Sequence, residues 1–174
     1  METIFARRSV RSYSSQPVSE AQINGLIRAA MAAPSAGNEQ PWEFVVVRER
    51  SLLEAVMAVH PYAAMLRQAP AAIVVCADPR RGKYPFDYWI QDCAAAAQNM
   101  LLAATGEGLG ACWLGVYPQP ERVAALRRIF SIPEPVVPFC VVAVGHPAQP
   151  QTAVDRFDPA RIHYEQWRQP GSVG

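Results

Sequence analysis

The sequence is poor in charge and has no long apolar run. Charged residues make up 18% of its 174 residues, below the usual share of about a quarter, while hydrophobic residues make up 51%. A monomer with so few charged residues would have too little polar surface to cover itself. We therefore expect a large buried interface, most simply that of a homodimer. The longest candidate for a membrane span, Cys93 to Ala104, is interrupted by Gln98 and Asn99. We therefore expect no membrane segment.

Several other signatures are also missing. The four cysteines, Cys76, Cys93, Cys112 and Cys140, are widely spaced within apolar runs, which argues against a metal site and against a dense disulfide framework. The first ten residues have no apolar core of signal-peptide length. The net charge of +1 gives no general attraction to nucleic acid or to membranes. We expect a cytoplasmic protein with buried, reduced thiols.

No familiar nucleotide motif or nucleophile–base pair is present. Gly106-Glu-Gly-Leu-Gly110 follows a predicted helix and precedes a predicted strand, which is the reverse of a dinucleotide-binding fingerprint, so we interpret it as a helix cap. Arg81-Gly-Lys83 lacks the upstream glycine of a P-loop. His60, His146 and His163 are isolated, and we expect them to be structural or exposed. If the protein is an enzyme, a cofactor must carry the chemistry.

What the sequence does contain is one layered domain over residues 1–174, with helices and strands mixed and no repeat or linker. Ser19 and Gln22 form a capping box that opens a helix, and Pro34 ends it. Strands are predicted at 42–47, 71–77, 111–116 and 136–144, and further helices at 2–8, 51–59, 88–105 and 119–130. Residues from Gly145 onwards have no core of their own. We expect them to wrap onto a neighbour, with a short helix near His163 to Trp167.

The helix from Tyr88 to Thr105 is apolar almost all round, so we expect it to be central and buried. Its polar residues Gln91 and Gln98, and likewise Asp92 and Asn99, lie seven apart, which predicts a shared polar seam. A buried carboxylate at Asp92 needs partners, because leaving it unsatisfied is costly. A structural seam and a catalytic role are both compatible with this pattern, and we favour the structural one.

Three short segments suggest ligand binding, each with a plainer alternative. Arg7, Arg8 and Arg11 surround Ser9, a combination that suits a terminal phosphate but also describes a solvated basic patch. The loop Pro34 to Trp42 offers Ser35, Asn38 and Gln40 to a flat polar ring, or is a rigid turn whose side chains bond its own backbone. The glycine of Trp113-Leu-Gly115 either lets a flat ligand approach the backbone or marks a bulge.

Taken in order, these segments resemble the nitroreductase family of flavin enzymes over nearly the whole chain. The matching segments are Arg7 to Arg11 (phosphate-binding segment), Pro34 to Trp42 (flavin loop), Asp92 with Gln98-Asn99, Gly108 to Gly110 and Trp113 to Gly115 (central helix and next strand), and Val142 to Pro147 with Arg156-Phe157 (last strand and C-terminal arm). The flavin loop is the most specific of these motifs.

The resemblance implies an α+β fold: a three-layer sandwich with a mixed central sheet flanked by helices. It also implies a homodimer with two FMN sites at the interface and a C-terminal arm, about 148–174, that lies on the partner subunit. The implied activity is ping-pong hydride transfer from NADH or NADPH, through FMN, to nitroaromatics, quinones or similar electron-poor acceptors. Alternatives are a specialised flavoprotein with one substrate (dehalogenation, desaturation or flavin breakdown), a flavin-binding protein without turnover, and a cofactor-free dimeric scaffold.

The resemblance also implies the residues that contact FMN. They are Arg7, Arg8, Ser9, Arg11 and Arg156 at the phosphate and ribityl chain, Pro34, Ser35, Ala36 and Asn38 on one side of the flavin from the other subunit, and Trp113, Leu114 and Gly115 along the ring. Gln40 stays unassigned. No residue is expected to act as catalytic acid or base, and no metal is expected. The short segment Asp78 to Asp87 implies an open, permissive site.

Overall fold

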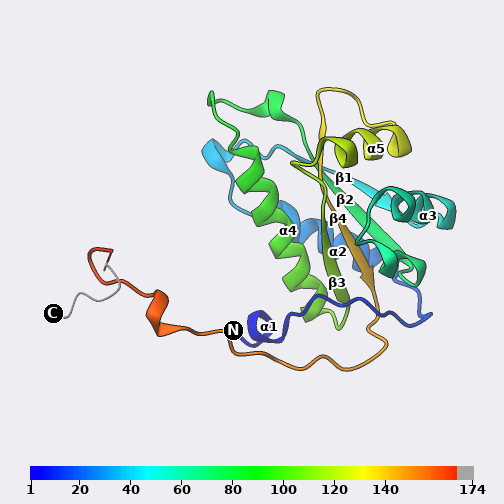
Figure 1. Cartoon of the computed structure of the whole chain (residues 1–174), viewed down its shortest axis with the longest axis horizontal. Helices are drawn as coiled ribbons and strands as arrows, with labels where there is room; N and C mark the ends of the chain where they lie inside the picture. Colours follow the sequence, from blue (N-terminus) through cyan, green and yellow to red (C-terminus); the bar gives the residue numbers. More distant parts are fainter. Residues whose placement is uncertain (168–174) are drawn as a thin grey trace.

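Strands with apolar side chains on both sides build a sheet that is covered on both faces. The computed structural model describes residues 1–167 and contains the strands β1 (Trp42–Val47), β2 (Ala71–Ala77), β3 (Gly110–Gly115) and β4 (Val137–Gly145). They form one sheet in the order β1-β2-β4-β3 (Figure 1). β1 and β3 are therefore its edge strands, and the two most apolar strands lie in the middle.

Helices cover both faces of this sheet, which confirms the predicted three-layer α+β sandwich. The helices are α1 (Glu2–Ala6), α2 (Glu20–Met31), α3 (Arg50–Val59), α4 (Trp89–Gly106) and α5 (Pro120–Phe130). α2 and α4 pack together against one face of the sheet, while α3 and α5 cover the other (Figure 1). Successive residues of β2 alternate between these two cores, as Ile73 and Val74 do.

The sheet was predicted to be mixed, and its four strands pair antiparallel throughout. Within residues 1–167, parallel pairing is confined to the isolated bridge between Ser9 and Ala111. This parallel bridge forms because the N-terminal segment, rather than a fifth strand, runs along the outer edge of β3. An antiparallel bridge between Tyr13 and Pro147 fixes the same segment further on.

Local signals in the sequence position the helix ends as expected. Ser19 and Gln22 form the predicted capping box at the start of α2. α4 ends at Gly106, and Gly108 has the positive φ of 70° typical of the residue after a helix. The predicted four-residue seam of α4 is wrong in part. Asp92 and Asn99 face α2 and its following loop, whereas Gln91 and Gln98 are exposed, because neighbours on a helix lie 100° apart.

Short 3₁₀ turns complete the chain: η1 (Ala36–Asn38), η2 (Ala64–Arg67), η3 (Pro79–Arg81) and η4 (Pro159–Arg161). The helix predicted near His163 to Trp167 is wrong. This segment is a bend in which Glu165 has a φ of 61°, a backbone angle incompatible with a right-handed helix. The regular turn lies earlier, at η4, where the Asp158 side chain accepts the N–H of Ala160 at 3.1 Å.

After β4 the chain crosses beneath the body and then extends away from it as an arm (Figure 1). Arg8 fixes the start of this arm by donating to the Thr152 carbonyl at 2.7 Å. Beyond that point Phe157 and Trp167 are exposed to 73% and 78%. The last residues of the predicted arm, 168–174, lie outside the described residues.

The four cysteines are free and buried, as expected. Desolvation raises the pKa of the Cys76 and Cys93 thiols to about 12, so both stay protonated near neutral pH. None of the helices in residues 1–167 has the length and apolar composition that a bilayer crossing needs.

Candidate functional site

The N-terminal segment lies along the outer edge of β3. The N–H of Val10 donates to the Ala111 carbonyl at 3.0 Å, and Val10 is buried. A Cβ on Gly110 would come within 2.7 Å of the Val10 side chain, so this close approach requires glycine. Because extended residues alternate between two sides, Arg7, Ser9 and Arg11 fall on the side opposite to Val10 and Arg8.

Arg7 and Arg11 flank Ser9, which forms the bridge to Ala111 at this edge. Burial raises the pKa of the Cys112 thiol in β3, and the positive charges of Arg11 and Arg7 oppose that shift. Within residues 1–167, Arg11 Nη1 donates to the Ser9 carbonyl at 3.3 Å. Among residues 1–167 no carboxylate forms a salt bridge with Arg7, Arg8, Arg11 or Arg156. The edge of β3 therefore carries positive charge that is not neutralised by ion pairs.

Arg156 and Arg8 lie beside this charge, in a groove of about 320 Å³ between α1 and the start of the arm. The groove is lined by Ile4, Phe5, Arg7, Arg8, Val154, Asp155, Arg156 and Phe157. Arg8 donates to the carbonyls of Arg7, Phe5, Thr152 and Val154, so most of its N–H groups are already used. Its geometry favours a structural tie between the N-terminal segment and the arm. The phosphate contact predicted for Arg8 stays a prediction.

The loop Pro34 to Trp42 is held in an uncommon conformation. Gly37, Asn38 and Gln40 have φ values of 53°, 55° and 48°, in the left-handed region that costs energy for residues with a side chain. The Gln40 N–H donates to Ser35 Oγ at 3.1 Å, and Gln40 Nε2 donates to Asn38 Oδ1 at 2.7 Å. The side chains thus brace the loop, as the rigid-turn alternative expects, and Asn38 keeps its Nδ2 group for other contacts.

Asp92, on α4, fixes this loop through a hydrogen bond to its backbone. Its Oδ1 accepts the N–H of Ala36 at 2.9 Å, and its buried Oδ2 has no hydrogen-bond partner in the described part of the chain. Burial raises the pKa of the Asp92 carboxyl; the Ala36 N–H opposes this shift, and the nearby Glu39 carboxylate adds to it. Asp92 is thus a structural anchor for the loop, and its charge is poorly compensated.

We predict that Asp92→Asn stabilises the protein at neutral pH. An asparagine oxygen can still accept the Ala36 N–H, while the buried charge is gone. Because the folded state raises the pKa of Asp92, ionisation costs stability as pH rises through that pKa, so the gain should shrink on acidification. Urea denaturation of the wild type and the variant at several pH values measures this difference.

Asp92→Ala is the matched control for this test, because it removes the acceptor as well as the charge. It should lose about 1–3 kcal/mol through the unsatisfied Ala36 N–H. If Asp92→Asn loses as much stability as Asp92→Ala, the charge itself holds the loop and the prediction is wrong.

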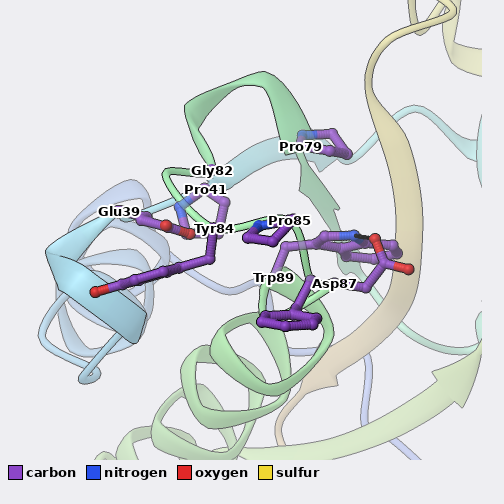
Figure 2. A pocket seen from close by; sticks show the side chains of 9 residues that line it. Glu39, Pro41, Pro79, Gly82, Tyr84, Pro85, Asp87 and Trp89 are labelled. Carbon is purple, nitrogen blue, oxygen red and sulfur yellow. Dashed lines mark hydrogen bonds between the residues drawn. The ribbon is translucent and has the colours of Figure 1, made fainter.

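A small pocket of about 100 Å³ lies beside the loop (Figure 2). It is lined by Glu39, Pro41, Pro79, Gly82, Tyr84, Pro85, Phe86, Asp87 and Trp89. Lys83 fixes this segment to the loop, because its N–H donates to Glu39 Oε1 and its Nζ donates to the Gly37 carbonyl at 2.8 Å. Figure 2 shows Tyr84 directed away from Asp87, whose Oδ1 accepts Trp89 Nε1–H at 2.9 Å. The pocket is far below the roughly 300–1,000 Å³ of cofactor sites and cannot hold a flavin alone.

The three residues predicted to meet the ring differ in what they expose. Trp113 is half-buried and packs edge-to-face on Phe139, with ring centroids 5.5 Å apart. The Leu114 side chain is buried in the opposite core, so only its backbone can reach a ligand. Gly115 is exposed, and a Cβ added to it would meet nothing within 4 Å. Free space for a flat group therefore exists at Gly115.

His60, which was not among the predicted site residues, contacts the backbone of Gly115. It is 2% exposed, and its Nε2 lies 2.8 Å from the Gly115 carbonyl oxygen. Burial lowers the pKa of His60; the bond to the Gly115 carbonyl opposes the shift, and the charge of Arg122 adds to it. This confirms the structural role expected for the residue, with a contact that lies 55 positions away in the sequence.

The predicted site residues form two groups in one chain. Arg7, Ser9 and Arg11 lie near the C-terminal end of α4, whereas the loop Pro34 to Trp42 lies beside its N-terminal end (Figure 1). The 18 residues of α4 span about 27 Å. Within the described part of the chain, no cluster of three or more His, Cys, Asp or Glu residues suits a metal ion. The chain therefore has basic and hydroxyl side chains suited to a phosphate near one end of α4, and a polar loop suited to a flat ring beside the other end.

Comparison with known proteins gives consistent matches along the chain. The model of the nitroreductase family matches residues 4–61 and 53–146. The chain is 51% identical over 170 residues to a candidate NADH dehydrogenase/NAD(P)H nitroreductase from Archaeoglobus fulgidus, covering 96% of this chain and 98% of the relative.

Two solved structures illustrate the shared fold. An FMN-dependent nitroreductase from Clostridium difficile R20291 superimposes with a TM-score of 0.88 at 26% identity, covering 96% of this chain and 100% of that one. A candidate nitroreductase from Desulfovibrio desulfuricans, in complex with FMN, superimposes with a TM-score of 0.81 at 30% identity, covering 96% of each chain.

Proposed function

The chain belongs to the nitroreductase family, and we propose that it is an FMN-dependent oxidoreductase that uses NADH or NADPH as donor. Its proposed acceptors are nitroaromatics, quinones or similar electron-poor compounds. The observation that carries the proposal is the edge of β3: the segment with Arg7, Ser9 and Arg11 pairs with the start of this strand, and the strand ends at the open Gly115. We further propose that residues 1–174 form a single FMN-binding domain.

The phosphate end of FMN fits the charge at the N-terminal segment. Arg7, Arg11 and Arg156 have no carboxylate partner within residues 1–167, so their positive charge is available to a phosphate. Ser9 adds a hydroxyl on the same side of the segment as Arg7 and Arg11. This donor set is chemically suited to a phosphate monoester and to the hydroxyls of a ribityl chain.

The ring end of FMN fits the backbone of Trp113, Leu114 and Gly115. A flat ring needs a surface without projecting side chains, and Gly115 supplies it at the end of an edge strand. Pro34, Ser35, Ala36 and Asn38 are proposed to line the opposite side of the ring from a second copy of the chain.

A two-chain site agrees with the separation of the two residue groups along α4. In one chain the Pro34 to Trp42 loop contacts the first turn of α4 through Asp92, whereas the segment that begins at Arg7 follows α1, which lies beside Gly106 at the other end of α4. The arm that extends from the body with an exposed Phe157 also supports a homodimer, since such a segment buries its apolar side chains only on a neighbour (Figure 1).

When bound, FMN supplies the redox chemistry by accepting a hydride from a reduced nicotinamide and passing electrons to an acceptor. The chain's own residues bind and orient. Arg7 and Arg11 hold the phosphate and contribute positive charge to the site. The Pro34 to Trp42 loop, fixed by Asp92 and Lys83, keeps its geometry while donor and acceptor exchange. No side chain is assigned as a general acid or base.

Steady-state kinetics test this proposal. Double-reciprocal plots with NADH or NADPH and a quinone or nitroaromatic acceptor should give parallel lines, the pattern of a ping-pong mechanism. Reduction of the bound flavin by NADH or NADPH in the absence of acceptor should occur at a rate at least equal to kcat. Flavin that binds but is reduced by neither nucleotide would indicate a flavin-binding protein without turnover.

One observation favours a specialised flavoprotein as a second candidate. The short segment Asp78 to Asp87 was predicted to leave the site open and permissive, yet Lys83 and Glu39 fix it to the flavin loop. A binding site lined by a rigid segment selects substrates by shape more strongly than one lined by a flexible segment. A kcat/KM for one acceptor at least about a hundredfold above all others tested would support this candidate, because that ratio corresponds to about 2.7 kcal/mol.

A further inference from the structure

The Gly115 carbonyl is held by two side chains from different elements. His60 Nε2 lies 2.8 Å from its oxygen, and Arg122 Nη1 donates to it at 2.9 Å. His60 follows the last residue of α3, and Arg122 lies in the first turn of α5. Since glycine has no side chain to pack, hydrogen bonds to its backbone are what fix its position.

The hydrogen bonds define the tautomer of His60. The Tyr62 N–H donates to His60 Nδ1 at 3.3 Å, so Nδ1 is an acceptor and Nε2 carries the proton that is donated to Gly115. The Arg122 guanidinium also lies over the Tyr62 ring, 5.7 Å from its centroid. The three side chains thus support one another around the Gly115 oxygen.

The N–H of Gly115 is directed away from the sheet. The neighbouring Val116 N–H donates to the Phe139 carbonyl, on the side of β4, at 3.2 Å. Residues of an antiparallel strand alternate between bonding the partner and pointing outward, so Gly115 presents its N–H and C=O to the outer edge. At the other end of β3, the Ala111 carbonyl points outward in the same way and accepts from Val10.

We propose that His60 and Arg122 are positioning residues for FMN: they hold the outward carbonyl of Gly115 so that its outward N–H is fixed as a donor to the flavin ring. This inference rests on the proposed function. A glycine at a strand end would otherwise sample many conformations, and a preorganised donor binds more tightly than a mobile one. Arg122 also adds a positive charge close to the same backbone, which favours negative charge on a reduced ring.

Ligand readouts separate this role from a purely structural one. The variants are Arg122→Ala, His60→Leu and the conservative His60→Gln, which keeps both a side-chain N–H and a carbonyl. Arg128→Ala is the matched control, since Arg128 is an exposed arginine of the same helix. For each protein we would measure the FMN dissociation constant of the apoprotein, the midpoint potential of the bound flavin and the stability to urea.

Arg122→Ala and His60→Leu should each raise the FMN dissociation constant at least tenfold, and Arg122→Ala should shift the midpoint potential to a more negative value. His60→Gln should recover part of the affinity, and Arg128→Ala should change neither quantity. In the apoprotein, the Gly115 amide should exchange with solvent faster in Arg122→Ala than in the wild type.

Arg122 is half-buried on the surface of α5, so its variant should fold even if His60→Leu does not. If Arg122→Ala folds and its FMN affinity and midpoint potential are unchanged, the inference is overturned. The hydrogen bonds of His60 and Arg122 to the Gly115 carbonyl would then have only a structural role. A wild type that binds no FMN would overturn the proposed function itself, and the inference with it. Measuring the wild type first distinguishes these two failures.

Discussion

Replacing both Arg7 and Arg11 with alanine is expected to weaken FMN binding by about 10²- to 10⁴-fold. Each variant removes a charge-assisted hydrogen bond worth about 1.5–3 kcal/mol. Two such losses sum to about 3–6 kcal/mol, and each 1.4 kcal/mol is a factor of ten. Neither arginine forms a salt bridge within residues 1–167, so the double variant should fold as the wild type does. Fluorescence titration of the apoprotein with FMN measures the change.

The matched control is Arg48→Ala combined with Arg128→Ala. Both arginines are exposed, and the double substitution changes the net charge by the same amount. It should leave FMN affinity within about twofold of the wild type, because neither arginine is among the predicted FMN contacts and exposed charges are screened by salt. If the Arg7 and Arg11 double variant binds FMN as tightly as this control, the phosphate assignment is wrong.

Gly115→Val is expected to weaken flavin binding by about 5- to 150-fold without unfolding the protein. A Cβ at this position meets nothing within 4 Å in the chain itself, and valine suits a strand, so stability should stay within about 0.5 kcal/mol. The added methyl groups would occupy the space in which the ring is proposed to lie. Overpacking of about 1–3 kcal/mol corresponds to FMN binding that is about 5- to 150-fold weaker.

Gly25→Ala provides the control for this variant. Gly25 lies in α2, and a Cβ there also meets nothing within 4 Å. Alanine should stabilise the helix by up to about 1 kcal/mol and leave FMN binding unchanged. Undiminished FMN affinity in a folded Gly115→Val variant would show that the ring does not approach this residue.

The strands and main helices could be predicted because their signals are local. The apolar run of β2, the capping box of Ser19 and the closing glycines of α4 are each read within a few residues. The predicted helix at the end of the arm failed because the φ of Glu165 is not encoded by apolar spacing. The mixed sheet was an expectation from the family resemblance, and the sequence carries no local signal that the parallel partner of β3 is the N-terminal segment.

The candidate site was only partly predictable for the same physical reason. The arginine segment, the flavin loop and the end of β3 are continuous motifs and can be recognised as such. The contacts that hold them are not continuous: Asp92 bonds Ala36 across 56 positions, and His60 bonds Gly115 across 55. Arg8 belongs to a recognisable motif, for which the family resemblance implies a phosphate contact. Its hydrogen bonds nevertheless go to the carbonyls of Thr152 and Phe5 and connect the N-terminal segment to the arm.

The most direct test of the proposed function is the visible absorption spectrum of the purified protein, followed by release and identification of any chromophore. We predict a yellow protein that releases about one FMN per chain on denaturation, because in the proposed homodimer each protomer would contribute one arginine segment and one loop to the two sites. A colourless protein that also fails to bind added FMN would contradict the proposal and would leave the charged edge of β3 without its ligand.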